Sequence, residues 1–246
     1  MKKAEWFENW FDSPYYHLLY SHRNYDEAER FIDNLCNYLK LKPGATIWDL
    51  ACGKGRHSLA LNKKGYKVTG TDLSENSIKE ASKNKNGSLE FLVHDMRSAF
   101  RENEFDAVLN LFTSIGYFSD FEDNYRVFKN IAKALKPGGR LVVDFFNPEK
   151  VRKALAVEQL EKRAHITFEI RKEVIGKAVV KNIQFHDQGK DYVFEERVNL
   201  LSHDDFNSFA EKAGLQLGEI FGNYNLDPWN AESSDRMILF FNKPAK

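Results

Sequence analysis

The sequence has few cysteines, no excess of charge of either sign and no long apolar run. Only Cys36 and Cys52 occur among 246 residues, which argues against a disulfide framework and favours a reducing, cytoplasmic setting. No Cys/His spacing typical of a metal site is present, so no bound metal is expected. Lysine plus arginine and aspartate plus glutamate each number 36, for a formal net charge of +0. A nucleic-acid-binding protein usually carries a basic excess, so we expect no nucleic-acid partner.

No apolar stretch approaches the about 20 residues that span a bilayer. Polar and acidic residues also interrupt the segment that follows Met1-Lys2-Lys3. We therefore expect neither a membrane segment nor a signal peptide. The length suits one α/β core with additions, and it leaves monomer and homodimer equally open.

The most informative segment that is present runs from Ile47 to His57. An apolar strand leads into Asp49-Leu50, a loop with Gly53 and Gly55 follows, and a helical pattern begins at Ser58. This order brings backbone N–H groups and a helix N-terminus to the carboxyl end of a strand, where α/β folds hold nucleotide-like ligands. The dinucleotide pattern G-x-G-x-x-G has a third glycine where this chain has Ser58. Taken alone, the loop is equally consistent with a tight connector.

A second predicted strand, residues 66–72, ends in Asp72, which lies 23 residues after Asp49. A carboxylate at that place in a βαβ unit accepts hydrogen bonds from ribose hydroxyls, and Ser74 is a suitable N-cap for the next helix. Further strands are predicted at 89–94, 105–111 and 140–146. A helix over 121–135 is ended by the Pro137-Gly138-Gly139 turn. Strands that alternate with helices predict a doubly wound, Rossmann-like, mostly parallel sheet.

Four motifs in this order resemble the class I S-adenosylmethionine-dependent methyltransferases. They are the loop Asp49–Gly55, the acid Asp72, the segment His94-Asp95-Met96 and the turn Leu135–Leu141. The resemblance covers residues 41–147, and 203–246 in outline, and it implies a seven-stranded sheet. Ala51 stands where that family often has glycine. Within the family, the chain is similar to the small-molecule branch of sugar-amine and glycine-type N-methyltransferases.

The resemblance implies S-adenosylmethionine as cofactor. Asp49 and the glycine loop would hold its methionine part, Asp72 its ribose, Asp95 and Met96 its adenine, and Asn110 and Phe112 would lie beside the sulfonium. For Asp72 and Asp95, the alternative is a structural cap or turn. The full predicted cofactor-binding set is Tyr20, Asp49, Ala51, Gly53, Gly55, Arg56, Asp72, Leu73, Asp95, Met96, Asn110 and Phe112.

A second group of candidates is aromatic. Residues 1–40 are predicted to be helical, and their tyrosines favour a lid over the cofactor, with Tyr20 or Arg23 near its carboxylate; an aromatic helix packed on the sheet is the alternative. The predicted acceptor-binding residues are Tyr16, His17, Tyr117 and Phe118. His17, His22, His57 and His186 are candidate bases, but a lone histidine is more often structural. No catalytic residue is singled out.

The predicted organisation has four parts. A helical lid (1–40) precedes the cofactor-binding core (41–147), and an antiparallel insertion (148–202) precedes the C-terminal completion of the sheet (203–246). Alternating apolar and polar residues at 164–174, 178–185 and 192–200 predict a three-stranded meander with one buried face. A helix over 204–213 and strands at 215–221 and 237–241 complete the core.

The sequence therefore predicts a methyltransferase that acts on an amine or a hydroxyl of a small molecule. One alternative is a nicotinamide-dependent oxidoreductase, which the missing third glycine disfavours. Another is a noncatalytic cofactor-binding module that works through a protein partner. A methyltransferase of RNA or protein is disfavoured by the neutral charge and by Asn110-Leu111-Phe112-Thr113, which lacks the Asn/Asp-Pro-Pro-aromatic motif of base-amine methylation.

Overall fold

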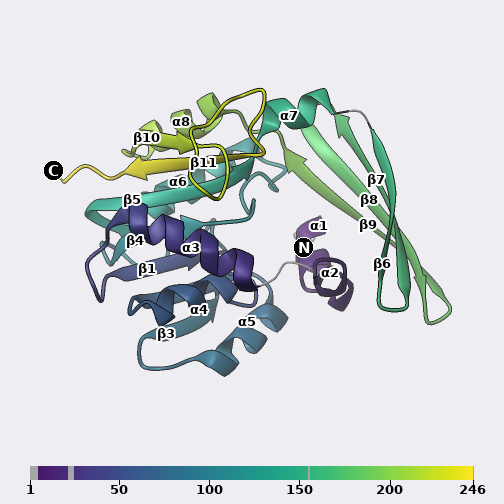
Figure 1. The fold of residues 1–246 in the computed structure, drawn as a ribbon, viewed down its shortest axis with the longest axis horizontal. Coiled ribbons are helices and arrows are strands. Elements are labelled where there is room, and N and C mark those ends of the chain that lie inside the picture. The colour runs from purple at the N-terminus through teal and green to yellow at the C-terminus, as the bar shows by residue number, and fades with distance from the viewer. Residues whose placement is uncertain (1–4, 22–24, 155, 246) are drawn as a thin grey trace.

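The computed structural model describes residues 5–21, 25–154 and 156–245, and it contains two sheets (Figure 1). The larger sheet has seven strands in the order β10-β11-β5-β4-β1-β2-β3. The pairs within β3-β2-β1-β4-β5 are parallel, whereas β11 runs antiparallel to β5 and to β10. This confirms the predicted doubly wound sheet. Its strands are β1 (Thr46–Leu50), β2 (Lys67–Asp72), β3 (Leu89–Val93), β4 (Phe105–Asn110), β5 (Leu135–Phe146), β10 (Gln216–Phe221) and β11 (Arg236–Asn242).

Helices cover both faces of this sheet. One apolar cluster joins α3, α4 and α5 to the sheet, and a second joins α6 and α8 to the opposite face. On α3, the apolar side chains of Phe31, Ile32 and Leu35 are buried. The Ser74 hydroxyl caps α5, as predicted, by accepting a hydrogen bond from the Ser77 backbone N–H. The helices are α3 (Tyr25–Leu39), α4 (Arg56–Lys63), α5 (Glu75–Ala81), α6 (Phe121–Ala134), α7 (Pro148–Lys153) and α8 (His203–Lys212), with a short 3₁₀ turn η1 (Ser82–Asn84).

The insertion is a meander of four strands, so the expectation of three was wrong by one. It comprises β6 (Val157–Arg163), β7 (Ile166–Ile175), β8 (Ala178–Asp187) and β9 (Lys190–Asn199), each antiparallel to the next. The additional strand, β6, is an edge strand with the sequence VEQLEKR, and most of its side chains are exposed. Because an edge strand needs no apolar alternation, its sequence carried no strand signal. A second difference concerns the predicted Pro137-Gly138-Gly139 turn, because the structure includes residues 135–139 in strand β5.

Two short N-terminal helices lie between the sheets, α1 (Trp6–Phe11) and α2 (Pro14–Leu19) (Figure 1). Trp10 and Leu19 are fully buried in a cluster with side chains of β7 and β8, such as Phe168 and Phe185. Trp10 and Leu19 therefore pack on the meander, whereas Phe7 belongs to the apolar cluster of the main sheet. Among the described helices, none has the length and apolar character of a membrane span.

We predict that Gly70→Ala destabilises the fold by about 1–3 kcal/mol, the usual cost of overpacking a core. Gly70 lies in β2, and a Cβ there would approach the Phe91 ring to 2.6 Å and the Cys52 Sγ to 3.0 Å. Gly87→Ala is the matched control, because a Cβ at Gly87 meets no atom within 4 Å. Urea unfolding of both variants measures the difference. Equal free energies of unfolding would contradict this account of the packing.

Candidate functional site

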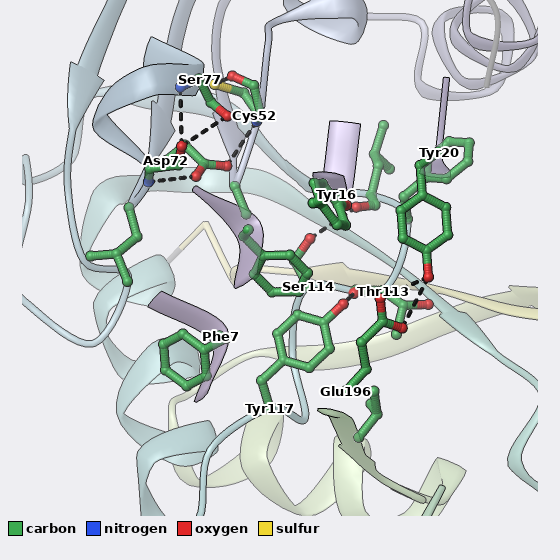
Figure 2. A pocket seen from close by; sticks show the side chains of 18 of the residues that line it. Phe7, Tyr16, Tyr20, Cys52, Asp72, Ser77, Thr113, Ser114, Tyr117 and Glu196 are labelled. Atoms are coloured by element: carbon green, nitrogen blue, oxygen red, sulfur yellow. Dashed lines mark hydrogen bonds between the residues drawn. The ribbon is translucent and has the colours of Figure 1, made fainter. Parts of the chain in front are cut away.

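A cavity of about 780 Å³ opens where the N-terminal helices, the meander and the carboxyl ends of the parallel strands meet. Its size falls in the range of about 300–1,000 Å³ that is typical of ligand pockets. In Figure 2, Asp72 and Cys52 mark one side and Tyr20 and Glu196 the other, with Tyr16 and other aromatic residues between them. The cavity thus has a polar end at the sheet and an aromatic end at the meander.

At the sheet end, Asp72 joins two loops. Its Oδ2 accepts a hydrogen bond from the Gly53 backbone N–H at 2.8 Å, and its Oδ1 accepts one from the Ser74 N–H at 2.9 Å. Burial raises the pKa of Asp72 above its usual value, against the effect of these hydrogen bonds. The carboxylate keeps further lone pairs for ligand hydroxyls.

The loop after β1 has three residues in the left-handed region, at Ala51, Gly53 and Gly55. Ala51 has φ +61°, where only glycine is free of strain, and this explains why glycine suits the position. A Cβ on Gly53 would meet no atom within 4 Å, so this part of the loop is open. A Cβ on Gly55 would approach the Phe91 ring to 2.6 Å, so Gly55 is required by packing.

Three of the predicted cofactor residues do not line the cavity: Asp49, Gly55 and Asn110. They instead stabilise the loop after β1. Asp49 is buried and accepts a hydrogen bond from the Ser58 hydroxyl, and burial raises its pKa to about 6. The Asn110 Nδ2 donates to the Leu50 carbonyl at 3.0 Å. The Asn110 Oδ1 is buried with no partner among the described residues, which leaves an acceptor beside the loop.

The loop after β4 is held by a buried ion pair. Phe112 and Thr113 have φ values of +63° and +60°, which cost free energy in residues other than glycine. The fully buried Asp144 accepts a hydrogen bond from the Phe112 N–H at 2.8 Å and one from the Arg236 Nε at 2.8 Å. Arg236 Nη2 also donates to the Thr113 hydroxyl at 3.0 Å. This network stabilises the strained loop that carries Phe112 into the cavity.

The loop after β3 is tied to the N-terminus by Arg97. Its Nη2 lies 2.7 Å from the Asp95 Oδ2, and its Nη1 lies 2.6 Å from the Glu5 Oε1. Burial alone would raise the pKa of Asp95, but hydrogen bonds from Arg97 hold it below its usual value. Asp95 is therefore ionised and fixed in place, and Met96 beside it lines the cavity.

At the meander end, Glu196 is the centre of a hydrogen-bond network. Its Oε1 accepts from the Tyr20 hydroxyl and from the Trp10 Nε1, each at 2.7 Å. The Lys181 Nζ donates to the Tyr20 hydroxyl at 2.5 Å. Tyr16 lies against Tyr20, with ring centroids 4.9 Å apart (Figure 2). These contacts fasten α2 to the meander and form an aromatic wall.

Most of the predicted residues meet in this cavity. The residues of the predicted set that line it are Tyr16, His17, Tyr20, Ala51, Gly53, Arg56, Asp72, Leu73, Asp95, Met96, Phe112, Tyr117 and Phe118. Arg23 and His22 lie outside the described residues. His186 of β8 pairs with Asp191 of β9 and does not line the cavity.

Three histidines line the cavity, His17, His57 and His94, and burial lowers the pKa of each, so all three are weak bases. Burial, with the positive charge of Lys54, lowers the pKa of His17 to about 4. Burial, with the positive charge of Arg56, lowers the pKa of His57 to about 3. His17 and His57 are therefore neutral at pH 7, and their pKa values lie far below the value near 7 that suits a general base.

Several lining residues escaped the sequence analysis, above all Lys172, Lys181, Glu196 and Arg236. A signal for three of them was present. Lys181 stands among Val179, Ile183 and Phe185, whose side chains are buried on one face of β8. A charged residue in the apolar register of a strand indicates a site, because the alternation puts it on the buried face. Glu196 occupies the same register in β9, and Lys172 occupies it in β7, where its side chain is exposed at the rim of the cavity.

The residues at the sheet end fit S-adenosylmethionine. Asp72 offers acceptors for a pair of hydroxyls, and the open face of Gly53 admits close approach of a ligand. Ring faces such as that of Phe112 attract a sulfonium cation. When bound, the cofactor supplies an electrophilic methyl group.

Comparison with known proteins gives the same result. Residues 48–143 match the model of a family described as a methyltransferase domain. The putative methyltransferase YqeM of Bacillus subtilis is 35% identical over 139 residues, which are 55% of this chain and 54% of that protein. A dTDP-3-amino-3,4,6-trideoxy-α-D-glucopyranose N,N-dimethyltransferase of Streptomyces venezuelae is 31% identical over 132 residues, 52% of this chain and 54% of that protein. These alignments thus span about half the length of the two relatives.

The fold of the whole chain has a counterpart among solved structures. An S-adenosylmethionine-dependent methyltransferase from Clostridium acetobutylicum superposes with a TM-score of 0.78 at 20% identity, over 94% of this chain and 96% of that chain. The seven-stranded sheet is the one expected from the sequence, and the family match favours methyl transfer over nicotinamide chemistry. Residues 48–143 therefore carry a methyltransferase domain, and the chain shares the fold of that solved methyltransferase.

Proposed function

We propose that this protein transfers the methyl group of S-adenosylmethionine to an amine nitrogen of a small molecule. The observation that carries the proposal is a cavity that has a polar end at Asp72 and an aromatic end at Tyr16, Tyr20 and Tyr117. A nitrogen becomes cationic when it is methylated, and ring faces together with the Glu196 carboxylate favour that charge. Amine acceptors are also named for the relative from Streptomyces venezuelae.

An amine fits this cavity better than a hydroxyl does. A hydroxyl acceptor loses its proton to a base, and the pKa values of His17 and His57, about 4 and about 3, make both histidines poor bases. An amine whose proton has already left to solvent needs only to be positioned with its lone pair toward the methyl group. The proposed role of the cavity is therefore orientation and exclusion of water.

The predicted cofactor contacts remain part of the proposal. Asp72 would accept the ribose hydroxyls, Gly53 and its neighbours would hold the methionine part, and Leu73, Asp95 and Met96 would enclose the adenine. Arg56 lies over the Phe112 ring, with its Cζ 4.1 Å from the centroid, and so supports both the loop after β1 and the loop after β4. We propose that Asp49, Gly55 and Asn110 do not contact the cofactor and instead hold the loop after β1 in place.

The proposed division of labour follows the four predicted parts of the chain. The core at 41–147 and the completion at 203–246 bind the cofactor. Of the predicted lid at 1–40, the described residues 5–21 bind the acceptor together with the insertion at 148–202, whereas α3 packs on the main sheet. Support comes from the lining of the cavity, since Phe11 and Tyr16 reach it from the N-terminal helices and Val179 and Glu196 from the meander.

We predict that S-adenosylmethionine and S-adenosylhomocysteine raise the melting temperature, whereas NADH and NADPH do not. A ligand that binds only the native state at 100 times its Kd stabilises it by about 2.7 kcal/mol. Differential scanning fluorimetry at equal ligand concentrations measures the shift. Stabilisation by NADPH without stabilisation by either sulfur compound would overturn the proposal.

We predict that Asp72→Ala weakens binding of S-adenosylhomocysteine by about 1.5–3 kcal/mol, the usual contribution of hydrogen bonds to a charged group. Asp191→Ala is the matched control, because Asp191 is an exposed carboxylate in the hairpin after β8. Isothermal titration calorimetry gives both affinities, and circular dichroism checks that the variants fold. Unchanged affinity in a folded Asp72→Ala variant would remove this carboxylate from the site.

We predict that S-adenosylhomocysteine slows amide hydrogen exchange in residues 5–21. The helices α1 and α2 are six residues each, too short to be stable alone, and they line the cavity, so a bound ligand adds contacts that hold them. Amides of α8, which lies outside the cavity lining, serve as the internal control. Equal protection of residues 5–21 with and without the ligand would show that they are a fixed wall and not a lid.

A further inference from the structure

We propose that the acceptor carries an anionic group, a phosphate or a carboxylate, and that Lys172 and Lys181 bind it at the meander end of the cavity. The inference rests on the proposed function in one respect: it assumes that the aromatic end of the cavity holds the acceptor. The anion site itself is a property of the sheet and is tested separately.

The two lysines face each other across neighbouring strands. In the register of the meander, Lys172 of β7 is opposite Lys181 of β8, and Lys181 is opposite Glu196 of β9. Side chains that are opposite in an antiparallel pair lie on the same face. The same face carries the buried Ile170 and Ile183, so this charged row belongs to the inner side of the meander, and all three members line the cavity.

The row carries two ammonium groups and one carboxylate. The ammonium of Lys181 donates to the Tyr20 hydroxyl and lies 3.8 Å from the Glu196 carboxylate. That carboxylate also accepts hydrogen bonds from Trp10 and Tyr20. No carboxylate of the described residues lies within salt-bridge distance of Lys172. Like charges directly opposite each other destabilise a sheet, and an anion between the two ammonium groups would reverse that effect.

The position of the row indicates which part of the acceptor it would meet. Figure 2 shows Asp72 and Glu196 on opposite sides of the cavity, with Tyr16 and Tyr117 between them. A cofactor held at Asp72 and the glycine loop would meet its acceptor among these rings. An acceptor with its amine among the rings therefore extends its far end to Lys172 and Lys181, and charge-assisted hydrogen bonds to phosphate or carboxylate fit ammonium donors.

The experiment measures binding of simple anions to the full chain. Inorganic phosphate, pyrophosphate and malonate are titrated at constant ionic strength in the presence of saturating S-adenosylhomocysteine, with the Kd obtained from thermal shift and calorimetry. Lys172→Gln removes the charge, and Lys172→Arg keeps it. Lys162→Gln is the matched control, because Lys162 lies on β6, one residue from the inward-facing Glu161, and so points to the outer face.

We expect at least one of the anions to bind, and we expect Lys172→Gln to weaken it by roughly tenfold, the scale of a hydrogen bond to a charged group. Lys172→Arg and Lys162→Gln should retain the affinity of the natural protein. Tighter binding of phosphate or pyrophosphate than of malonate would indicate an acceptor with a phosphate group. Tighter binding of malonate would indicate an acceptor with a carboxylate. Three results would overturn the proposal. The first is that Lys172→Gln binds the anion as tightly as the natural protein does, and the second is that Lys162→Gln loses as much anion affinity as Lys172→Gln does. The third is that the natural protein binds none of the anions.

The same titrations separate this inference from the proposed function. S-adenosylhomocysteine should bind Lys172→Gln as tightly as it binds the natural protein, because the lysine lies at the other end of the cavity. If the natural protein binds anions through Lys172 but binds no S-adenosylhomocysteine, the proposed function fails and the anion site stands. If it binds S-adenosylhomocysteine and no anion, the anion site fails and the proposed cofactor stands.

Discussion

The parallel pairing of β1 with both β2 and β4 is the constraint on which the site depends. The chain winds from β1 to β2 and β3 on one side and returns to β4 and β5 on the other. The loops after β1 and β4 consequently diverge at the carboxyl edge of the sheet and leave a crevice between them. The hydrogen bonds from Gly53 and Ser74 to the Asp72 carboxylate then fix the loop after β1 against the loop after β2. The polar end of the cavity follows from strand order and one carboxylate.

The other end depends on apolar burial far from the main sheet. The helices α1 and α2 are held on the meander by Trp10 and Leu19, and each large apolar side chain that is fully buried contributes about 1.5–3 kcal/mol. The Trp10 indole N–H also donates to Glu196, so the residue that anchors the helix orients a carboxylate of the cavity. Packing and polar recognition are thus joined at one side chain, and the aromatic wall could not exist without the inserted sheet.

Backbone strain is concentrated between these two ends. Phe112 and Thr113 take left-handed conformations that cost free energy, and the buried pair of Asp144 and Arg236 supplies the hydrogen bonds that hold them. Removing either charge would leave the other buried and unpaired, which is far more costly than losing a surface ion pair. The position of the Phe112 ring, beside the predicted place of the sulfonium, therefore depends on residues in β5 and β11 that are distant in sequence.

Sequence patterns alone predicted the parallel core, the glycine loop, Asp72 and the Ser74 cap, because each depends on residues close together in the chain. Tertiary structure alone showed that Gly55 and Asn110 support the loop from behind, and it added the edge strand β6. It also brought the charged row of the meander to the cavity. These features depend on strand register and on contacts between residues tens to hundreds of positions apart, and a local pattern carries no information about which of its faces meets which partner.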